Sequence, residues 1–154
     1  MSKVELGRKA PPFSLDGTAG TWSLSEAAGS NVVIYFYPRD NTPGCTQEGE
    51  SFARAYAQFD KLKTRIVGIS PDSVASHVKF KQKMGFPFEL LADATQTVCK
   101  LYDVIREKSM YGKKYMGVER STFLIDAKGV LRAQWRKVKV NGHAEAVLAA
   151  VKAL

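Results

Sequence analysis

The strongest constraint on the fold is the junction between residues 31 and 45, where an apolar run stops at a proline and a turn-rich loop leads to a cysteine. The run Asn31–Tyr37 is β-branched and aromatic on both faces, which is typical of a central strand covered on both sides. The loop Pro38–Gly44 is dense in turn formers. Beyond it, apolar side chains recur with helical spacing, which predicts a helix from about Cys45 to Leu62.

The rest of the chain continues the alternation of strands and helices. Further strands are expected around Trp22 and over Arg65–Ser70, Phe88–Leu91, Arg120–Asp126 and Val130–Val138, and further helices over Asp72–Gly85, Gln96–Ile105 and His143–Leu154. This order predicts an α/β fold of the thioredoxin-like kind, with a central mixed β-sheet flanked by helices. No repeat, low-complexity tract or linker interrupts the sequence, so residues 1–154 are expected to form a single domain.

Charge and apolar content narrow the classes of function. The net charge of +8 raises the question of nucleic acid, but the basic residues are scattered and accompany no nucleic-acid-binding signature. We therefore expect no nucleic-acid partner. The longest apolar stretch, Val32–Tyr37, is far too short to cross a bilayer, and the N-terminus lacks the apolar core of a signal peptide. These features predict a cytoplasmic protein without membrane association.

The cysteines and histidines do not have the spacing of a metal site. Cys45 and Cys99 are too few for a disulfide framework. Together with His77 and His143 they form none of the short pairs that structural zinc sites use. We expect neither a metal nor any other cofactor.

Cys45 lies where the loop opens a helix. Unpaired amide groups and the positive end of the helix dipole favour an anion there, and hence the nucleophilic thiolate. Thr42 can turn its hydroxyl toward the sulfur or toward an oxygen beside it. Pro38 and Pro43 stiffen the loop that holds Thr42 and Cys45. The alternative is that Cys45 is only a small buried apolar residue, and its position alone does not decide between these interpretations.

The residues of the loop favour the first interpretation. The string Pro38-Arg-Asp-Asn-Thr42-Pro-Gly-Cys45 resembles the Pro-x-x-x-Thr-x-x-Cys signature of the peroxiredoxins, and Phe36–Thr46 is similar to their bacterioferritin-comigratory, or Q-type, subfamily. The similarity continues through Gly7–Leu15, Val67–Asp72, Lys113–Asp126 and His143. It implies a thioredoxin-like fold and a thiol peroxidase that reduces hydrogen peroxide and organic hydroperoxides to water and alcohols.

The resemblance also implies roles for four residues. Cys45 would be the peroxidatic cysteine, whose thiolate attacks a hydroperoxide and becomes a sulfenic acid. Thr42 would donate a hydrogen bond to the bound peroxide, and Pro38 would shield the pocket from water. Arg120 would stabilise the thiolate and the charge that develops on the leaving oxygen. The alternatives are that Arg120 is a surface cation and that Thr42 only caps the helix.

The chain departs from the family in its second cysteine. Many members place a resolving cysteine five residues after the first, where this chain has Glu50, and others place it near Phe80–Gly85, which contains none. Cys99 is the remaining internal candidate. It falls beside the apolar stripe of its expected helix, and a disulfide with Cys45 would require Cα atoms within about 7 Å. We therefore expect Cys99 to be a half-buried structural residue.

A one-cysteine cycle follows from this reading. The sulfenic acid on Cys45 would be reduced by an external thiol, either thioredoxin or glutathione with glutaredoxin. The subfamily also suggests a monomer. A two-cysteine cycle in which Cys99 is the resolving thiol remains the alternative.

Other functions have less support. A dithiol oxidoreductase requires Cys-x-x-Cys, but Thr42 occupies the partner position before Cys45 and Glu48 occupies the one after it. A redox sensor or chaperone that uses Cys45 would differ from a peroxidase only in turnover. His77 is expected to be partly exposed on its helix.

Overall fold

The apolar run after Ser30 forms the strand around which the fold is built. The computed structural model describes residues 4–154, and in this range β3 (Asn31–Phe36) is parallel to β4 (Thr64–Ser70) and antiparallel to β8 (Ser121–Ile125). The full mixed sheet has the order β2-β1-β5-β4-β3-β8-β9. Its other strands are β1 (Ser14–Gly17), β2 (Gly20–Ser23), β5 (Glu89–Ala92) and β9 (Leu131–Trp135).

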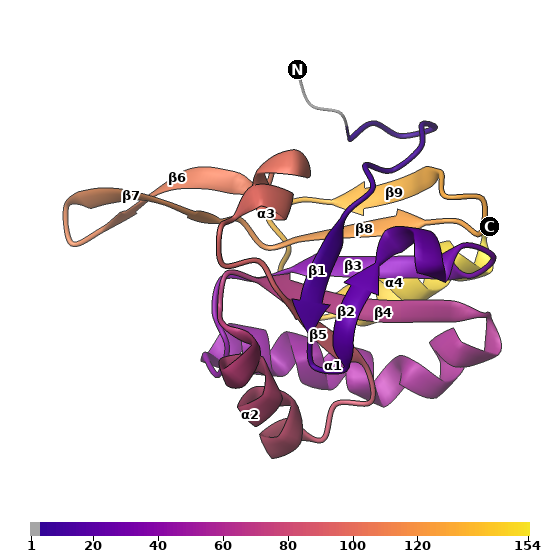
Figure 1. Cartoon of the computed structure of the whole chain (residues 1–154), viewed down its shortest axis with the longest axis horizontal. Coiled ribbons are helices and arrows are strands. Elements are labelled where there is room, and N and C mark those ends of the chain that lie inside the picture. Colours follow the sequence, from indigo (N-terminus) through magenta and orange to yellow (C-terminus); the bar gives the residue numbers. More distant parts are fainter. Residues whose placement is uncertain (1–3) are drawn as a thin grey trace.

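Helices cover both faces of this sheet, which confirms the predicted thioredoxin-like α/β fold (Figure 1). One face packs against α1 (Pro43–Lys61), α2 (Val74–Met84) and α4 (His143–Lys152). The other face packs against the short helices η1 (Leu24–Ala27) and α3 (Thr97–Leu101).

Alternate side chains of β3 enter the two cores. Val33 and Tyr35 lie in the core beneath α1, whereas Ile34 and Phe36 lie in the core beneath α3. The strand is buried on both sides because its side chains point alternately to opposite faces and those from Val32 onward are apolar or aromatic.

The structure corrects the predicted start of α2. Ser73, rather than Asp72, caps this helix, and its hydroxyl accepts a hydrogen bond from the Ser76 amide at 3.1 Å. The Asp72 carboxylate instead accepts the Asp40 amide at 2.6 Å. Asp72 therefore ties α2 to the loop after β3. Gly85 follows the helix with φ +68°, as expected of a terminating glycine.

The helix expected over Gln96–Ile105 is wrong beyond Leu101. Asp103 adopts a left-handed conformation, φ +57°, which ends the helical path. Apolar spacing could not detect this, because Tyr102 and Val104 are both buried in the core on either side of the turn.

A two-stranded arm that was not predicted follows this turn. β6 (Ile105–Met110) and β7 (Lys113–Val118) pair only with each other among the described residues, and the arm projects from the body of the domain (Figure 1). Its exposed apolar side chains are Met110, Tyr111, Tyr115 and Met116. Hydrophobic patterning does not predict this arm, because its two strands carry many charged or polar residues and do not alternate regularly.

Gly49 allows α1 to approach the ring of Phe86, in the loop between α2 and β5, and a mutation there tests this packing. A Cβ atom at this position would lie 2.9 Å from Cε2 of the Phe86 ring and closer still to Cζ. We expect Gly49→Ala to lower the free energy of unfolding by about 1–3 kcal/mol, because the buried ring must move.

Urea unfolding measures this change. As a control in the same helix, Ala57→Gly at an exposed position should cost about 1 kcal/mol through helix propensity alone. If Gly49→Ala were more stable than the parent chain, the close approach of α1 to Phe86 would be contradicted.

Candidate active site

The first turn of α1 presents Cys45 at the positive end of the helix. Pro43 is the first helical residue, two residues before the predicted start, and Thr42 is the N-cap. The first helical hydrogen bond runs from the Thr46 amide to the Thr42 carbonyl at 2.8 Å. The amides of Gly44 and Cys45 therefore precede the helical ladder, where they favour a negative charge. The Cys45 side chain is 2% exposed.

Sheet pairing brings Arg120 to this turn from 75 positions along the chain. Phe36 at the end of β3 is paired with Ser121 at the start of β8, so the residue before β8 lies beside the loop that follows β3. The Arg120 Nη2 donates to the Cys45 Sγ over 3.4 Å. A Cβ atom on Gly44 would lie 3.1 Å from Nη2, so glycine leaves room for the guanidinium at this point.

Glu48 is a buried partner of Arg120 that the sequence reasoning did not identify. Its Oε1 accepts from the Arg120 Nη1 at 2.6 Å, and the side chain is 1% exposed. Its Oε2 is buried without a hydrogen-bond partner in the described part of the chain. Burial raises the pKa of Glu48 to about 7, against the opposing effect of Arg120. Glu48 follows Cys45 by three residues, which places both on one face of the helix, and this spacing was the signal for Glu48 in the sequence.

The guanidinium is held as a cation between these two groups. Burial opposes its charge, but Glu48 and Cys45 together raise the pKa of Arg120 above its ordinary value. The arrangement places a buried sulfur and a guanidinium donor side by side, and this donor can stabilise negative charge that develops at or near the sulfur.

Thr42 and Pro38 border the same loop. The Thr42 hydroxyl donates to the Arg39 carbonyl at 3.0 Å and makes no capping bond to α1. Its donor is therefore directed to the loop and has to rotate to reach a bound substrate. Pro38 is half-buried directly after Tyr37, whose amide still donates to the Ile69 carbonyl at 3.0 Å.

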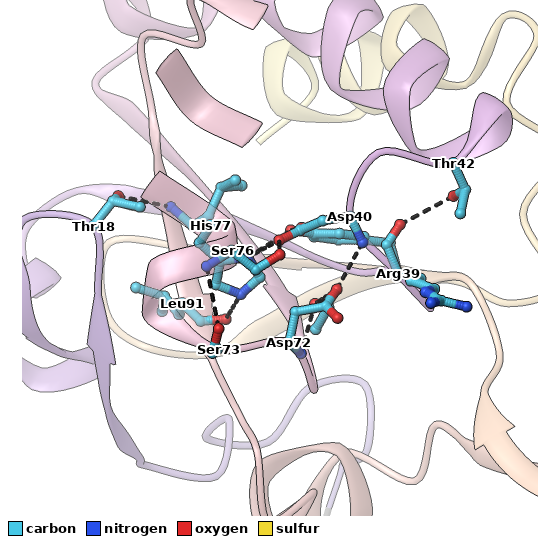
Figure 2. A network of polar contacts seen from close by, with 12 residues as sticks. Thr18, Arg39, Asp40, Thr42, Asp72, Ser73, Ser76, His77 and Leu91 are labelled. Atoms are coloured by element: carbon cyan, nitrogen blue, oxygen red, sulfur yellow. Dashed lines mark hydrogen bonds and ion pairs between the residues drawn. The ribbon is translucent and has the colours of Figure 1, made fainter. Parts of the chain in front are cut away.

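The prediction that His77 is partly exposed is wrong, because its side chain is fully buried. It lies on the same face of α2 as Phe80, three residues later, and this face packs on the sheet. The ring Nδ1 lies 2.7 Å from the Asp40 Oδ2, and Nε2 lies 2.9 Å from the Leu91 carbonyl oxygen (Figure 2). A buried histidine thus contacts the loop that precedes Cys45.

Cys99 is also more buried than expected. Its exposed fraction is zero, its amide donates to the Asp93 Oδ2 at 2.7 Å, and burial together with Asp93 raises the pKa of the Cys99 thiol. Cys99 belongs to the core beneath α3, whereas Cys45 belongs to the core beneath α1, on the other face of the sheet. The prediction that Cys99 is half-buried was therefore wrong, because its side chain is fully buried.

Within residues 4–154, no three acidic, histidine or cysteine side chains are grouped closely enough to hold a metal ion. No helix in that range has the length and apolar character needed to traverse a bilayer.

The fold and the site together define a thiol-dependent enzyme of the thioredoxin-like class. The model of the AhpC/TSA family matches residues 6–134. The chain is 53% identical over 142 residues to peroxiredoxin Bcp of Xanthomonas campestris, covering 92% of this chain and 88% of the relative. It is 47% identical over 150 residues to peroxiredoxin Bcp of Bacillus subtilis, covering 97% and 96%. The chain belongs to the AhpC/TSA family of peroxiredoxins and is a thiol peroxidase of the Bcp, or Q-type, group.

Solved structures agree with this assignment. A cysteine-to-serine mutant of the Q-type peroxiredoxin of Xylella fastidiosa superimposes with a TM-score of 0.92 at 40% identity, covering 99% of this chain and 98% of that chain. Peroxiredoxin Q of X. campestris gives a TM-score of 0.87 at 51% identity, covering 92% and 90%. A yeast mitochondrial 1-Cys peroxiredoxin gives 0.83 at 27% identity, covering 97% and 76%, and its description names thiol resolution through glutathione and thioredoxin systems.

Proposed function

We propose that Cys45 is the peroxidatic cysteine of this peroxidase. The observation that carries the proposal is the 3.4 Å approach of the Arg120 Nη2 to Sγ at the open start of α1. The Cys45 thiolate attacks the terminal oxygen of a hydroperoxide, so that an S–O bond forms while the O–O bond breaks. The products are a cysteine sulfenic acid and a hydroxide or alkoxide, which takes up a proton to become water or an alcohol.

The neighbouring residues stabilise and enclose this displacement. Arg120 donates to the sulfur and to the departing oxygen, whose negative charge grows in the transition state. Thr42 rotates its hydroxyl from the Arg39 carbonyl toward the peroxide and holds it in line for attack. Pro38 forms the wall that keeps bulk water away from the sulfur.

The cycle is completed by an external thiol. The sheet lies between Cys45 and Cys99, and Cys99 is fully buried in its own core, which supports a one-cysteine cycle. A thiol attacks the sulfenic sulfur, water leaves, and a second thiol then releases Cys45 from the mixed disulfide. Thioredoxin, or glutathione with glutaredoxin, supplies these thiols to a monomeric enzyme in the cytoplasm, with hydrogen peroxide and organic hydroperoxides as substrates.

The test is peroxide consumption under each reducing system by the parent chain, Cys45→Ser and Cys99→Ala. Cys45→Ser should abolish turnover, because serine provides no thiolate. Cys99→Ala should retain it with the productive reductant. Replacing the buried Cys99 should only lower the free energy of unfolding, by about 1–2 kcal/mol, because it leaves a small cavity.

Two outcomes would contradict the proposal in different ways. Turnover that survives Cys45→Ser would remove Cys45 from the chemistry. If Cys99→Ala stopped turnover while peroxide still oxidised Cys45, Cys99 would be the resolving thiol and the cycle would use two cysteines. Mass spectrometry of the oxidised chain distinguishes a sulfenic acid from an internal disulfide.

A further inference from the structure

The buried contacts of the loop that carries Pro38 and Thr42 centre on Asp40, and the exposed Asn41 Oδ1 also accepts a hydrogen bond from the Lys83 Nζ of α2 at 3.0 Å. The side chain of Asp40 is 4% exposed and accepts three hydrogen bonds, from the Tyr37 hydroxyl at 2.6 Å, the Ser76 hydroxyl at 2.7 Å and the His77 Nδ1 at 2.7 Å. Its amide donates to Asp72 (Figure 2). Burial alone would raise the pKa of Asp40, but the hydrogen bonds that it accepts hold it below its ordinary value.

The geometry of His77 determines how this contact is made. Its Nε2 faces the Leu91 carbonyl, which can only accept, so this nitrogen donates. Its Nδ1 faces the Asp40 carboxylate at 2.7 Å, which is also an acceptor when ionised. The ring therefore bridges the Leu91 carbonyl and the Asp40 carboxylate. It forms a charge-assisted hydrogen bond out of contact with water.

This bond connects two elements to the loop. His77 belongs to α2, its Nε2 is anchored on β5 through Leu91, and Asp40 lies midway between Pro38 and Thr42. Displacing the loop must break the bond to Asp40. The free energy of that break sets how often the loop opens.

The proposed cycle requires both a closed and an open loop. Cys45 is 2% exposed, so the bulky thiol of a protein or of glutathione cannot reach the sulfur while the loop is closed. The reductant can reach the sulfenic sulfur only when the loop and the first turn of α1 move. A closed loop also leaves the sulfenic acid available for a second peroxide, which oxidises it to sulfinic acid with release of water or alcohol.

We propose that Asp40 and His77 form the clamp that closes this loop, and that His77 is a positioning residue for Cys45. The inference rests on the proposed function. The clamp favours attack on peroxide and opposes reduction by thiol. Weakening it slows oxidation of Cys45, speeds reduction of the sulfenic acid and lowers the yield of sulfinic acid.

Two substitutions of one residue separate the clamp from the fold. In His77→Gln the side-chain amide nitrogen can take the place of Nε2 and keep the Leu91 contact, while the contact to Asp40 is lost. In His77→Asn the amide nitrogen can take the place of Nδ1 and keep the contact to Asp40. Ser73→Ala is the control, because it removes the cap of α2 without touching Asp40.

The measurements are the stopped-flow rate of Cys45 oxidation by hydrogen peroxide, the rate of sulfenic acid reduction by thioredoxin and by glutathione with glutaredoxin, and the sulfinic acid yield by mass spectrometry. His77→Gln should lower the rate of Cys45 oxidation about tenfold and raise the rate of sulfenic acid reduction several-fold, as expected when one charge-assisted hydrogen bond is lost. The sulfinic yield should fall. His77→Asn and Ser73→Ala should stay near the parent values.

The outcomes are distinct. If His77→Gln matched Ser73→Ala in both rates, or if both of its rates fell together, the clamp would be overturned. If His77→Gln failed to fold, Ser76→Ala would replace it, because it removes one hydrogen bond to Asp40. Ser76→Ala should slow oxidation and speed reduction by a smaller factor. Unchanged rates in Ser76→Ala would contradict the proposed clamp. A parent chain whose Cys45 is not oxidised at all would instead contradict the proposed function.

Discussion

Replacing Arg120 with methionine should lower the rate constant for oxidation of Cys45 by hydrogen peroxide by about 10²–10³-fold. Methionine keeps much of the volume of the side chain but removes the donor that lies 3.4 Å from Sγ. The thiolate loses its cation and the departing oxygen loses a fixed partner. Stopped-flow measurement under single-turnover conditions reports this step without the reductant.

The same replacement also leaves Glu48 buried without its partner, and a second variant separates this effect. Breaking a buried ion pair from one side costs about 3–5 kcal/mol, so Arg120→Met should unfold at a lower urea concentration. The double variant Arg120→Met/Glu48→Gln has no buried charge to compensate, and its stability should largely recover. Its oxidation rate should not recover. A double variant that regained the rate would assign the loss to unfolding rather than to catalysis.

The free energy of unfolding should decrease between about pH 4.5 and pH 7 because of Glu48. Burial raises the pKa of this carboxyl from 4.5 to about 7 in the folded chain. A carboxyl with a raised pKa stabilises the fold fully while it is protonated in both states, and this contribution is lost as the pH rises through the folded pKa. Since one pKa unit corresponds to about 1.4 kcal/mol, the loss amounts to about 3 kcal/mol.

Glu48→Gln is the matched control, because glutamine has the same shape and does not ionise. Urea unfolding at several pH values between 4 and 8 should give a smaller decrease for the variant than for the parent chain. Equal slopes in the two proteins would show that Glu48 keeps an ordinary pKa in the fold. In that case the lowering of the Glu48 pKa by Arg120 would outweigh the raising of this pKa by burial.

The sequence predicted the core of the site because its signals are local. A doubly apolar strand, a proline-bounded loop and a helical repeat are adjacent in the chain, so the position of Cys45 at a strand–helix junction could be derived directly. The role assigned to Arg120 came from the resemblance instead. Its place beside Sγ depends on the pairing of β3 with β8, which local patterns do not fix.

What the sequence missed depends on packing between distant elements. His77 and Glu48 are polar residues on helices, where exposure is the ordinary expectation. Partners on other elements make their burial tolerable, namely Asp40 and the Leu91 carbonyl for His77 and Arg120 for Glu48. The helix expected to reach Ile105 failed because apolar spacing continues through a backbone turn. In each case the deciding contact joins residues far apart in the chain or lies in the backbone.

The arm formed by β6 and β7 has a consequence for engineering. Tyr111 at its tip is 97% exposed and Gly112 follows with φ +77°, while the hydrogen bond from the Glu119 amide to the Val104 carbonyl at 2.7 Å closes its base. A peptide or a fluorescent domain inserted at the tip therefore replaces exposed residues and leaves the base of the arm, where Ile105 pairs with Val118, unchanged. The chain offers a built-in insertion point through which peroxide chemistry can be joined to a genetically encoded reporter.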